Sequence, residues 1–143
     1  MNRKSVLTVF MAGLVVLLAA VNILKHPQGP LADIPPLLSA QAEEHILYGD
    51  SRGGGHLYGT GRACKSEFPE DWDEQQIITH VKEIAANDNL NWEKQRNGYH
   101  VAEEMVETVR VRVVLDQNQT KIITAYPTNV PRNPCPNKAA NDN

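Results

Sequence analysis

The stretch VRVRVVLDQNQTKIITAY, residues 109–126, decides the fold. Its first half alternates with the period of two that a β-strand requires, so that one face carries Val109, Val111, Val113 and Leu115 and the other carries Arg110 and Arg112. The polar residues 116–120 predict a turn, and residues 121–126 predict a partner strand. The sequence therefore predicts an antiparallel pair of strands near the C-terminal end.

The same alternation assigns faces in the second strand. It places Ile122, Thr124 and Tyr126 on one face, and Ile123 and Ala125 on the other. Thr124 and Tyr126 are therefore expected to point to the same side of the sheet. The prolines at 127, 131, 134 and 136 cannot donate to a strand ladder, so we expect the following tail to wrap around the domain instead of extending the sheet.

A helix is predicted before the strands. Asp71 and Glu74 have the spacing of a capping box, and Ile77, Val81 and Ile84 then recur at helical spacing. The polar residues 87–89 end this pattern. The expected fold class is thus α+β: one small domain with an N-terminal helical part and a C-terminal antiparallel β-sheet.

The N-terminal end has the pattern of a membrane segment. Residues 6–24 carry no charge and follow Arg3 and Lys4, an arrangement that leaves the N-terminus in the cytoplasm and exports the rest. A run of this length favours an uncleaved membrane helix over a signal peptide, whose apolar region is about 7–15 residues. Ala19 and Ala20 would still permit cleavage. The protein is expected to face the periplasm or exterior from the inner membrane, or to be secreted if cleaved.

Four segments follow from these patterns. They are a membrane anchor or signal peptide over residues 1–25, a Pro-rich linker over 26–42, the folded domain over 43–136 and a disordered tail over 137–143. The formal charge of the chain is −3, and the expected domain carries more acidic than basic residues. This balance excludes a broad basic surface for nucleic acid, so any phosphate contact must be local.

Two cysteines, Cys64 and Cys135, lie in the exported part. An even count in an oxidising compartment favours a disulfide, which would stabilise the fold by about 4 kcal/mol through loop closure. Two free buried thiols are the alternative.

Two histidines flank a glycine-rich loop in the stretch HILYGDSRGGGHLYG, residues 45–59. Imidazole titrates near neutral pH, so His45 and His56 together could remove one proton and donate another without a metal or cofactor. Taken alone, the stretch is more typical of two surface histidines beside a flexible loop.

Four motifs occur in order: HILYGD at 45–50, GGGHLYGTG at 53–61, KSEFPEDW at 65–72 and ITAYPTNVPRNP at 123–134. Through them the chain resembles the bacterial EndoU nuclease family over residues 43–134. The resemblance implies a toxin domain with metal-independent endoribonuclease activity on a scaffold shared with barnase-like and RelE-like nucleases. It further implies RNA as substrate, tRNA among the candidates, a monomeric chain without cofactor, and a cognate immunity protein.

The resemblance also implies roles for single residues. His45 and His56 match the acid/base pair, and Thr124 and Tyr126 match the residues that contact the phosphate and nucleoside. One histidine would take the proton of a ribose 2′-OH, which attacks phosphorus, and the other would protonate the departing 5′-oxygen. The products would be a 2′,3′-cyclic phosphate and a 5′-hydroxyl.

The phosphate contacts are less specified. Gly54 and Gly55 would let backbone N–H groups approach the phosphate. The lysine that many family members use has no counterpart identified by motif, and the cations that could replace it are Lys65, Lys94, Arg96, His100, Arg110, Arg112 and Arg132.

Two other classes of function stay open. His45, His56, Cys64 and Cys135 could form a zinc site, although their spacing matches no compact zinc motif. Loss of the family lysine would suit a membrane-anchored binding module whose active site has degenerated.

Overall fold

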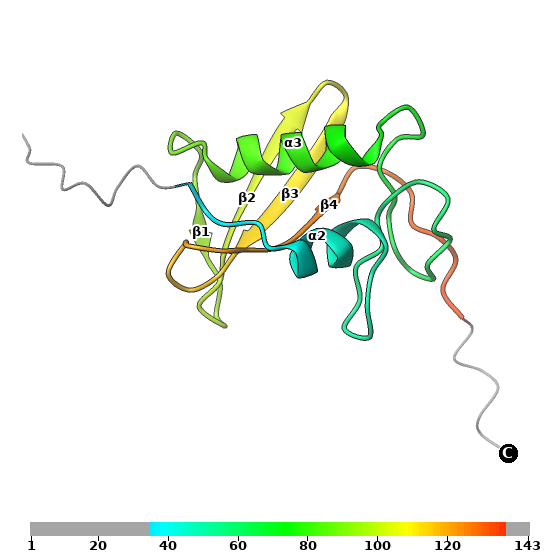
Figure 1. The fold of residues 1–143 in the computed structure, drawn as a ribbon, viewed down its shortest axis with the longest axis horizontal. Helices are drawn as coiled ribbons and strands as arrows, with labels where there is room; N and C mark the ends of the chain where they lie inside the picture. The colour runs from blue at the N-terminus through cyan, green and yellow to red at the C-terminus, as the bar shows by residue number, and fades with distance from the viewer. Residues whose placement is uncertain (1–34, 137–143) are drawn as a thin grey trace, which may run out of the picture. The chain divides into compact units, whose positions relative to one another are not determined.

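The computed structural model describes residues 35–136, which form two helices and a four-stranded antiparallel sheet (Figure 1). The helices come first along the chain and the strands follow, with the sheet in the order β1-β2-β3-β4. This arrangement confirms the predicted α+β class. The elements are α2 (Ala40–Leu47), α3 (Glu74–Ala85), β1 (Glu93–Lys94), β2 (His100–Val106), β3 (Val109–Leu115) and β4 (Ile122–Pro127).

The core lies between α3 and the sheet. Helix α3 packs on β2 and β3, and α2 packs on β4 (Figure 1). The alternation predicted for β3 is confirmed, because Val109, Val111, Val113 and Leu115 are at most 4% exposed while Arg110 and Arg112 are not in the core. The predicted stripe of α3, Ile77, Val81 and Ile84, is equally buried and faces them. The other face of the sheet carries Arg110, Arg112 and Tyr126 together with the apolar Val114.

The predicted N-cap of α3, Asp71, is wrong by two residues. Its N-cap is Asp73, whose carboxylate accepts a hydrogen bond from the Gln76 N–H at 2.8 Å while the Gln76 side chain accepts from the Asp73 N–H at 2.9 Å. Asp71 instead lies in a turn closed by a hydrogen bond from the Trp72 N–H to the Pro69 carbonyl. Trp72 is 3% exposed, and its burial holds this turn in place, so the helix begins later in the sequence than predicted.

A β-bulge changes the predicted faces of β4. Leu115 pairs with Ile122 whereas Val114 pairs with Thr124, which leaves Ile123 without a partner in β3. An extra residue in one strand reverses the alternation on either side of it. Ile122 therefore faces the core, and the prediction that it shares a face with Thr124 is wrong. Thr124 and Tyr126 do share the face away from the core, as predicted.

Three elements, α2, β1 and β2, lie where no element was specified. Strand β2 contains Glu103 and Glu104, and only Ala102 in it is fully buried, so its alternation is too weak to see in the sequence. Helix α2 begins at Ala40, within residues 26–42, after Leu37 has already paired with Lys121. The ordered chain thus begins before residue 43.

The expected membrane segment, residues 6–24, and the expected disordered tail, residues 137–143, lie outside the described residues. Within residues 35–136 neither helix is long and apolar enough to cross a membrane.

Candidate active site

A cavity of about 330 Å³ opens between the end of α2, the glycine loop and the outer face of β4. It collects all four residues expected to carry the chemistry, together with three cations. Its lining residues are His45, Arg52, Gly54, His56, Cys64, Lys65, Ser66, Thr124, Tyr126 and Arg132. Segments far apart in the sequence therefore form one pocket, which we call the catalytic cavity.

Hydrogen bonds to the last turn of α2 place His56 beside His45. The N–H groups of Gly55, His56 and Leu57 donate to the carbonyls of residues 45, 46 and 47 at 3.0, 2.8 and 3.0 Å. The loop after Gly54 thus runs along the carbonyl groups that the end of a helix leaves without intrahelical partners. These backbone hydrogen bonds hold the two histidines in neighbouring segments, which the sequence pattern alone could not establish.

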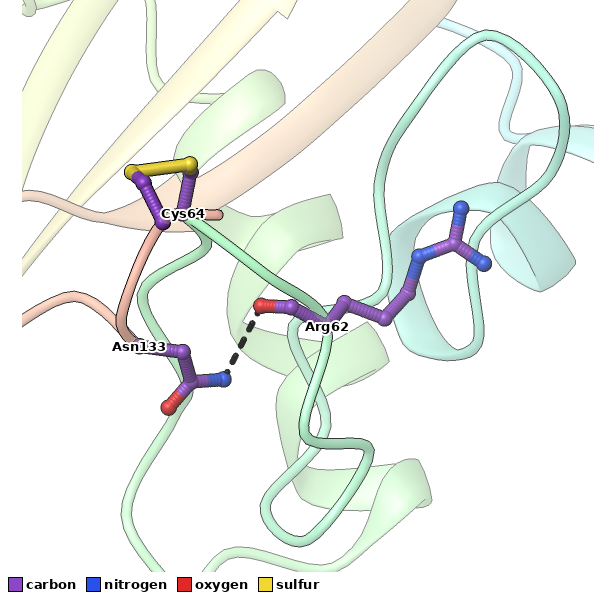
Figure 2. The surroundings of a disulfide bond; sticks show 4 residues. Arg62, Cys64 and Asn133 are labelled. Atoms are coloured by element: carbon purple, nitrogen blue, oxygen red, sulfur yellow. Dashed lines mark hydrogen bonds between the residues drawn. A yellow bond between two sulfur atoms is a disulfide. The ribbon is translucent and has the colours of Figure 1, made fainter. Parts of the chain in front are cut away.

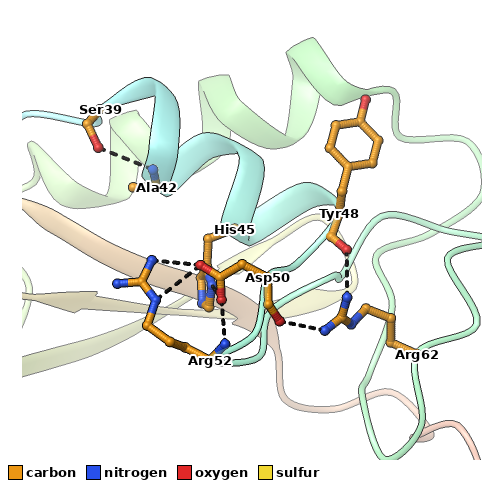
Figure 3. A network of polar contacts seen from close by, with 7 residues as sticks. All are labelled: Ser39, Ala42, His45, Tyr48, Asp50, Arg52 and Arg62. Atoms are coloured by element: carbon orange, nitrogen blue, oxygen red, sulfur yellow. Dashed lines mark hydrogen bonds and ion pairs between the residues drawn. The ribbon is translucent and has the colours of Figure 1, made fainter.

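The glycines permit this close approach. Gly54 has φ +74°, and a Cβ atom there would lie 1.9 Å from the carbonyl oxygen of His45. Gly55 has φ +80°, and its Cβ would lie 2.1 Å from Cδ of Arg62. Arg62 in turn donates to the carbonyls of Tyr48 and Asp50 and holds the other side of the loop (Figure 3). Gly54 lines the catalytic cavity, whereas Gly55 is packed behind it.

His45, in the last turn of α2, lies beside a carboxylate. Its Nδ1 is 3.1 Å from Oδ1 of Asp50, but the direction does not suit a hydrogen bond, and Nδ1 is buried without such a partner among residues 35–136. Arg52 donates to Asp50 through its backbone N–H and its guanidinium, at 2.6 to 3.1 Å (Figure 3). These bonds hold the pKa of Asp50 well below its usual range. An ionised carboxylate therefore faces the ring of His45.

His56 has a different environment. It is 5% exposed, and its Nδ1 lies 2.7 Å from the carbonyl oxygen of Ser66. A carbonyl can only accept, so Nδ1 carries the hydrogen and Nε2 of the neutral ring keeps its lone pair. Burial lowers the pKa of His56, and the positive charge of Lys65 adds to that effect. The neutral ring is therefore favoured near pH 7.

Tyr126 packs against His56 on the outer face of β4. The two rings are stacked with centroids 5.4 Å apart. Arg112, on β3, donates to the Tyr126 hydroxyl at 3.4 Å and is itself held by Glu103 at 2.7 Å. Because the Tyr126 oxygen accepts from Arg112, its own hydrogen is available to a ligand. Thr124 lies one pleat away on the same face.

Only some of the predicted cations reach the cavity. Lys65 and Arg132 line the catalytic cavity. An isolated antiparallel β-bridge between Ser66 and Arg132 brings their two segments together. Lys94, Arg96 and His100 lie on or beside the β1–β2 hairpin and do not line it. Arg110 and Arg112 are on β3, where both pair with Glu103. Of the cations named from the sequence, only Lys65 and Arg132 therefore line the catalytic cavity.

Three contributors were not foreseen from the sequence: Asp50, Arg52 and Ser66. Asp50 and Arg52 belong to the stretch between the two histidines, and their alternating charges were the available signal. Ser66 is recognisable only in three dimensions. Its carbonyl orients His56, and its hydroxyl donates to the carbonyl of Pro127 at 2.7 Å.

The predicted disulfide is present and borders the cavity. Cys64 is bonded to Cys135, which joins the segment before Lys65 to the tail after β4 (Figure 2). Asn133 reinforces this connection, since its side chain donates to the Arg62 carbonyl at 3.1 Å and its N–H donates to the Lys65 carbonyl at 2.7 Å. The tail thus wraps back along residues 62–66.

The zinc site is not formed by these residues. Cys64 and Cys135 are bonded to each other, so neither offers a thiolate beside the histidines. In the described part of the chain, no group of three or more His, Cys, Asp or Glu side chains has the arrangement of a metal site. The ligand set considered from the sequence is therefore wrong.

Comparison with known proteins gives one match. The family model described as bacterial EndoU nuclease matches residues 59–129, and no curated protein or solved structure matches. The matched residues include α3, the whole sheet and the half of the catalytic cavity that holds Lys65, Thr124 and Tyr126, whereas His45 and His56 precede them. The match agrees with the order of motifs and with the α+β architecture, and the chain belongs to the bacterial EndoU nuclease family.

Proposed function

We propose that this nuclease cleaves RNA by attack of a ribose 2′-OH on the adjacent phosphate. The observation that supports the proposal most is that two imidazoles line one cavity in opposite electrostatic environments. One is buried and neutral, and the other faces an ionised carboxylate. Two histidines in such different surroundings suit the separate roles of a general base and a general acid.

His56 is the general base in this proposal. Its Nδ1–H is held by the Ser66 carbonyl, so the lone pair of Nε2 can accept the proton of the 2′-OH. The freed oxygen attacks phosphorus and forms the 2′,3′-cyclic diester. DNA lacks the attacking hydroxyl, so the mechanism requires RNA.

His45 is the general acid. The carboxylate of Asp50 lies 3.1 Å from Nδ1, and the opposite nitrogen, Nε2, is the proton donor. That proton goes to the 5′-oxygen as the P–O5′ bond breaks, leaving a 5′-hydroxyl on the departing strand. The ring of His45 is then neutral and that of His56 is protonated, and exchange with water restores both.

The negative charge that develops on the phosphorane oxygens is stabilised by Lys65 and Arg132, which both line the catalytic cavity. Thr124 and Tyr126 offer hydroxyl donors in the same cavity. These residues give a local positive surface, which suits a domain whose overall charge is negative. No resident metal or cofactor is required by these steps.

The biological setting is a further part of the proposal. The uncharged residues 6–24 and the disulfide both suit an exported protein. Since an RNase outside the cell finds little RNA, we propose a toxin that acts in the cytoplasm of a neighbouring cell and has an immunity protein. Fractionation of producing cells tests the location, and recovery of the chain only in the cytosolic fraction would contradict it.

Activity is tested with the purified, oxidised chain, single-stranded RNA and DNA of the same sequence, and EDTA. We expect cleavage of RNA alone, and a fall of about 10²–10⁴-fold in rate for His45→Ala and for His56→Ala. His80→Gln is the matched control, because His80 packs on Trp72 and does not line the catalytic cavity. A fully active single variant would contradict the acid/base pair, and absence of cleavage in the parent chain would favour the binding module.

A further inference from the structure

A second cavity, of about 590 Å³, adjoins the catalytic cavity and has no role in the chemistry described so far. The two cavities share His45, Arg52 and Thr124. Beyond these residues the second one is lined by Leu37, Tyr99, Lys121 and Ile123, among others. We call it the adjoining cavity. Its volume lies in the range of about 300–1,000 Å³ that is usual for small-molecule sites.

Backbone pairing holds the floor of the adjoining cavity in place. The Leu37 N–H donates to the Thr120 carbonyl at 2.8 Å, and the Ile122 N–H donates to the Leu37 carbonyl at 3.0 Å. The β-bulge then leaves Ile123 outside the ladder, and its side chain lines the cavity beside Thr124. Bulges commonly re-aim side chains next to active sites. The site is therefore built on paired backbone.

The chemistry of the lining suits one nucleotide. Tyr99 gives an aromatic ring on which a base can stack, and Leu37 and Ile123 give apolar walls. Lys121 and Arg52 supply positive charge for phosphate at two edges of the same space. An aromatic platform with flanking cations is the usual arrangement for single-stranded nucleic acid.

The residues shared by the two cavities indicate the direction in which a bound RNA strand would run. His45 lines both cavities, whereas His56 and Tyr126 line only the catalytic one. The nucleotide whose 2′-OH attacks must be at His56, and the nucleotide whose 5′-oxygen leaves must be at the proton donor, His45. The leaving nucleotide therefore extends from His45 away from His56, toward Tyr99 and Lys121.

We propose that the adjoining cavity binds the nucleotide on the 3′ side of the scissile phosphate, with its base against Tyr99 and its downstream phosphate near Lys121. This inference rests on the proposed function. It makes the leaving group a determinant of rate, because binding energy from that nucleotide can position its 5′-oxygen against His45.

The experiment compares two substrates of the full chain that share the same 5′ nucleotide. One is a set of dinucleoside monophosphates, and the other is the matching nucleoside 3′-methyl phosphodiesters, which lack the 3′ nucleoside. For Tyr99→Ala we expect kcat/KM to fall about 5- to 100-fold on the dinucleotides, as for loss of one base stack, and to stay the same on the methyl esters. Tyr99→Phe should keep most of the activity on both.

Tyr58→Ala is the matched control, because Tyr58 is 52% exposed and lines neither cavity. Lys121→Ala, at an exposed position, provides a second variant, and its loss should be larger when the dinucleotide carries a 3′-phosphate. An equal loss on both substrates, or none on either, would overturn the inference while leaving the proposed function intact. If the parent chain cleaves neither substrate nor longer RNA, the proposed function itself fails.

Discussion

Replacement of Gly54 by alanine tests how the two histidines are brought together. The position has φ +74°, which costs an alanine roughly 1–2 kcal/mol, and the new Cβ would lie 1.9 Å from the His45 carbonyl oxygen. That carbonyl belongs to α2 and also accepts the Gly55 N–H, so the contact is relieved only by moving the loop off the helix. A lost buried hydrogen bond adds about 1–3 kcal/mol. We expect Gly54→Ala to lower the free energy of unfolding by about 3 kcal/mol.

Gly59→Ala is a matched control for this change. Gly59 has φ +83°, but an added Cβ there would meet no atom within 4 Å. It should therefore lose only the conformational cost, about 1–2 kcal/mol, and keep its activity. Urea denaturation gives both free energies, and RNA cleavage rates below the transition give activity. If Gly54→Ala were as stable and as active as Gly59→Ala, the close approach of the loop to α2 would not be what positions His45 and His56.

Three further predictions concern the charges and the disulfide around the site. Asp50→Asn removes the negative charge beside His45 and should lower kcat about tenfold or more at pH 7, with Asp88→Asn, at an exposed position, as the unaffected control; equal rates in the two variants would contradict the role of Asp50. Because burial lowers the pKa of His56, this base is still neutral at the ordinary histidine pKa of about 6.5. On the acid side, kcat/KM should therefore fall only below about pH 6.5, and a fall centred above that pH would contradict the assignment of His56 as the base. Replacing both Cys64 and Cys135 by serine should cost about 4 kcal/mol of stability, measured in urea, and dithiothreitol should destabilise the parent chain but not the double variant.

The strand pair shows what the sequence could predict. Strand β3 was predictable because every core position in it is apolar and Arg110 and Arg112 occupy the other face. The faces of β4 were only half predictable, because a bulge depends on the partner strand and leaves no mark in residues 121–126. The prediction that Thr124 and Tyr126 share a face is confirmed, since both residues lie on the same side of the bulge.

Helix boundaries show a second kind of limit. Asp71 and Asp73 are both good N-cap residues, and local sequence does not distinguish them. The burial of Trp72 decides between them, and that burial is a tertiary contact. The same limit applies to α2, whose eight residues are too few to show a clear apolar stripe.

The residues of the site also differ in how far they could be predicted from the sequence. The two histidines could be proposed from their residue types and the glycine loop, because the chemistry of imidazole is a local property. The candidate cations could be named but not ranked, since Lys65 and Arg132 are brought together only by the tail that wraps back along residues 62–66. Arg96 and His100, also among the candidates, lie elsewhere on the sheet edge and its hairpin.

The central claim is that His45 and His56 catalyse attack by the 2′-OH, and the most direct measurement uses one synthetic RNA cut at a single site in EDTA. The account predicts a 2′,3′-cyclic phosphate on the upstream product and a 5′-hydroxyl on the downstream product, both identified by mass spectrometry. A single 2′-deoxy substitution at the nucleotide before the cut should abolish cleavage at that site. A 5′-phosphate on the downstream product, or cleavage that persists in the 2′-deoxy RNA, would contradict the account.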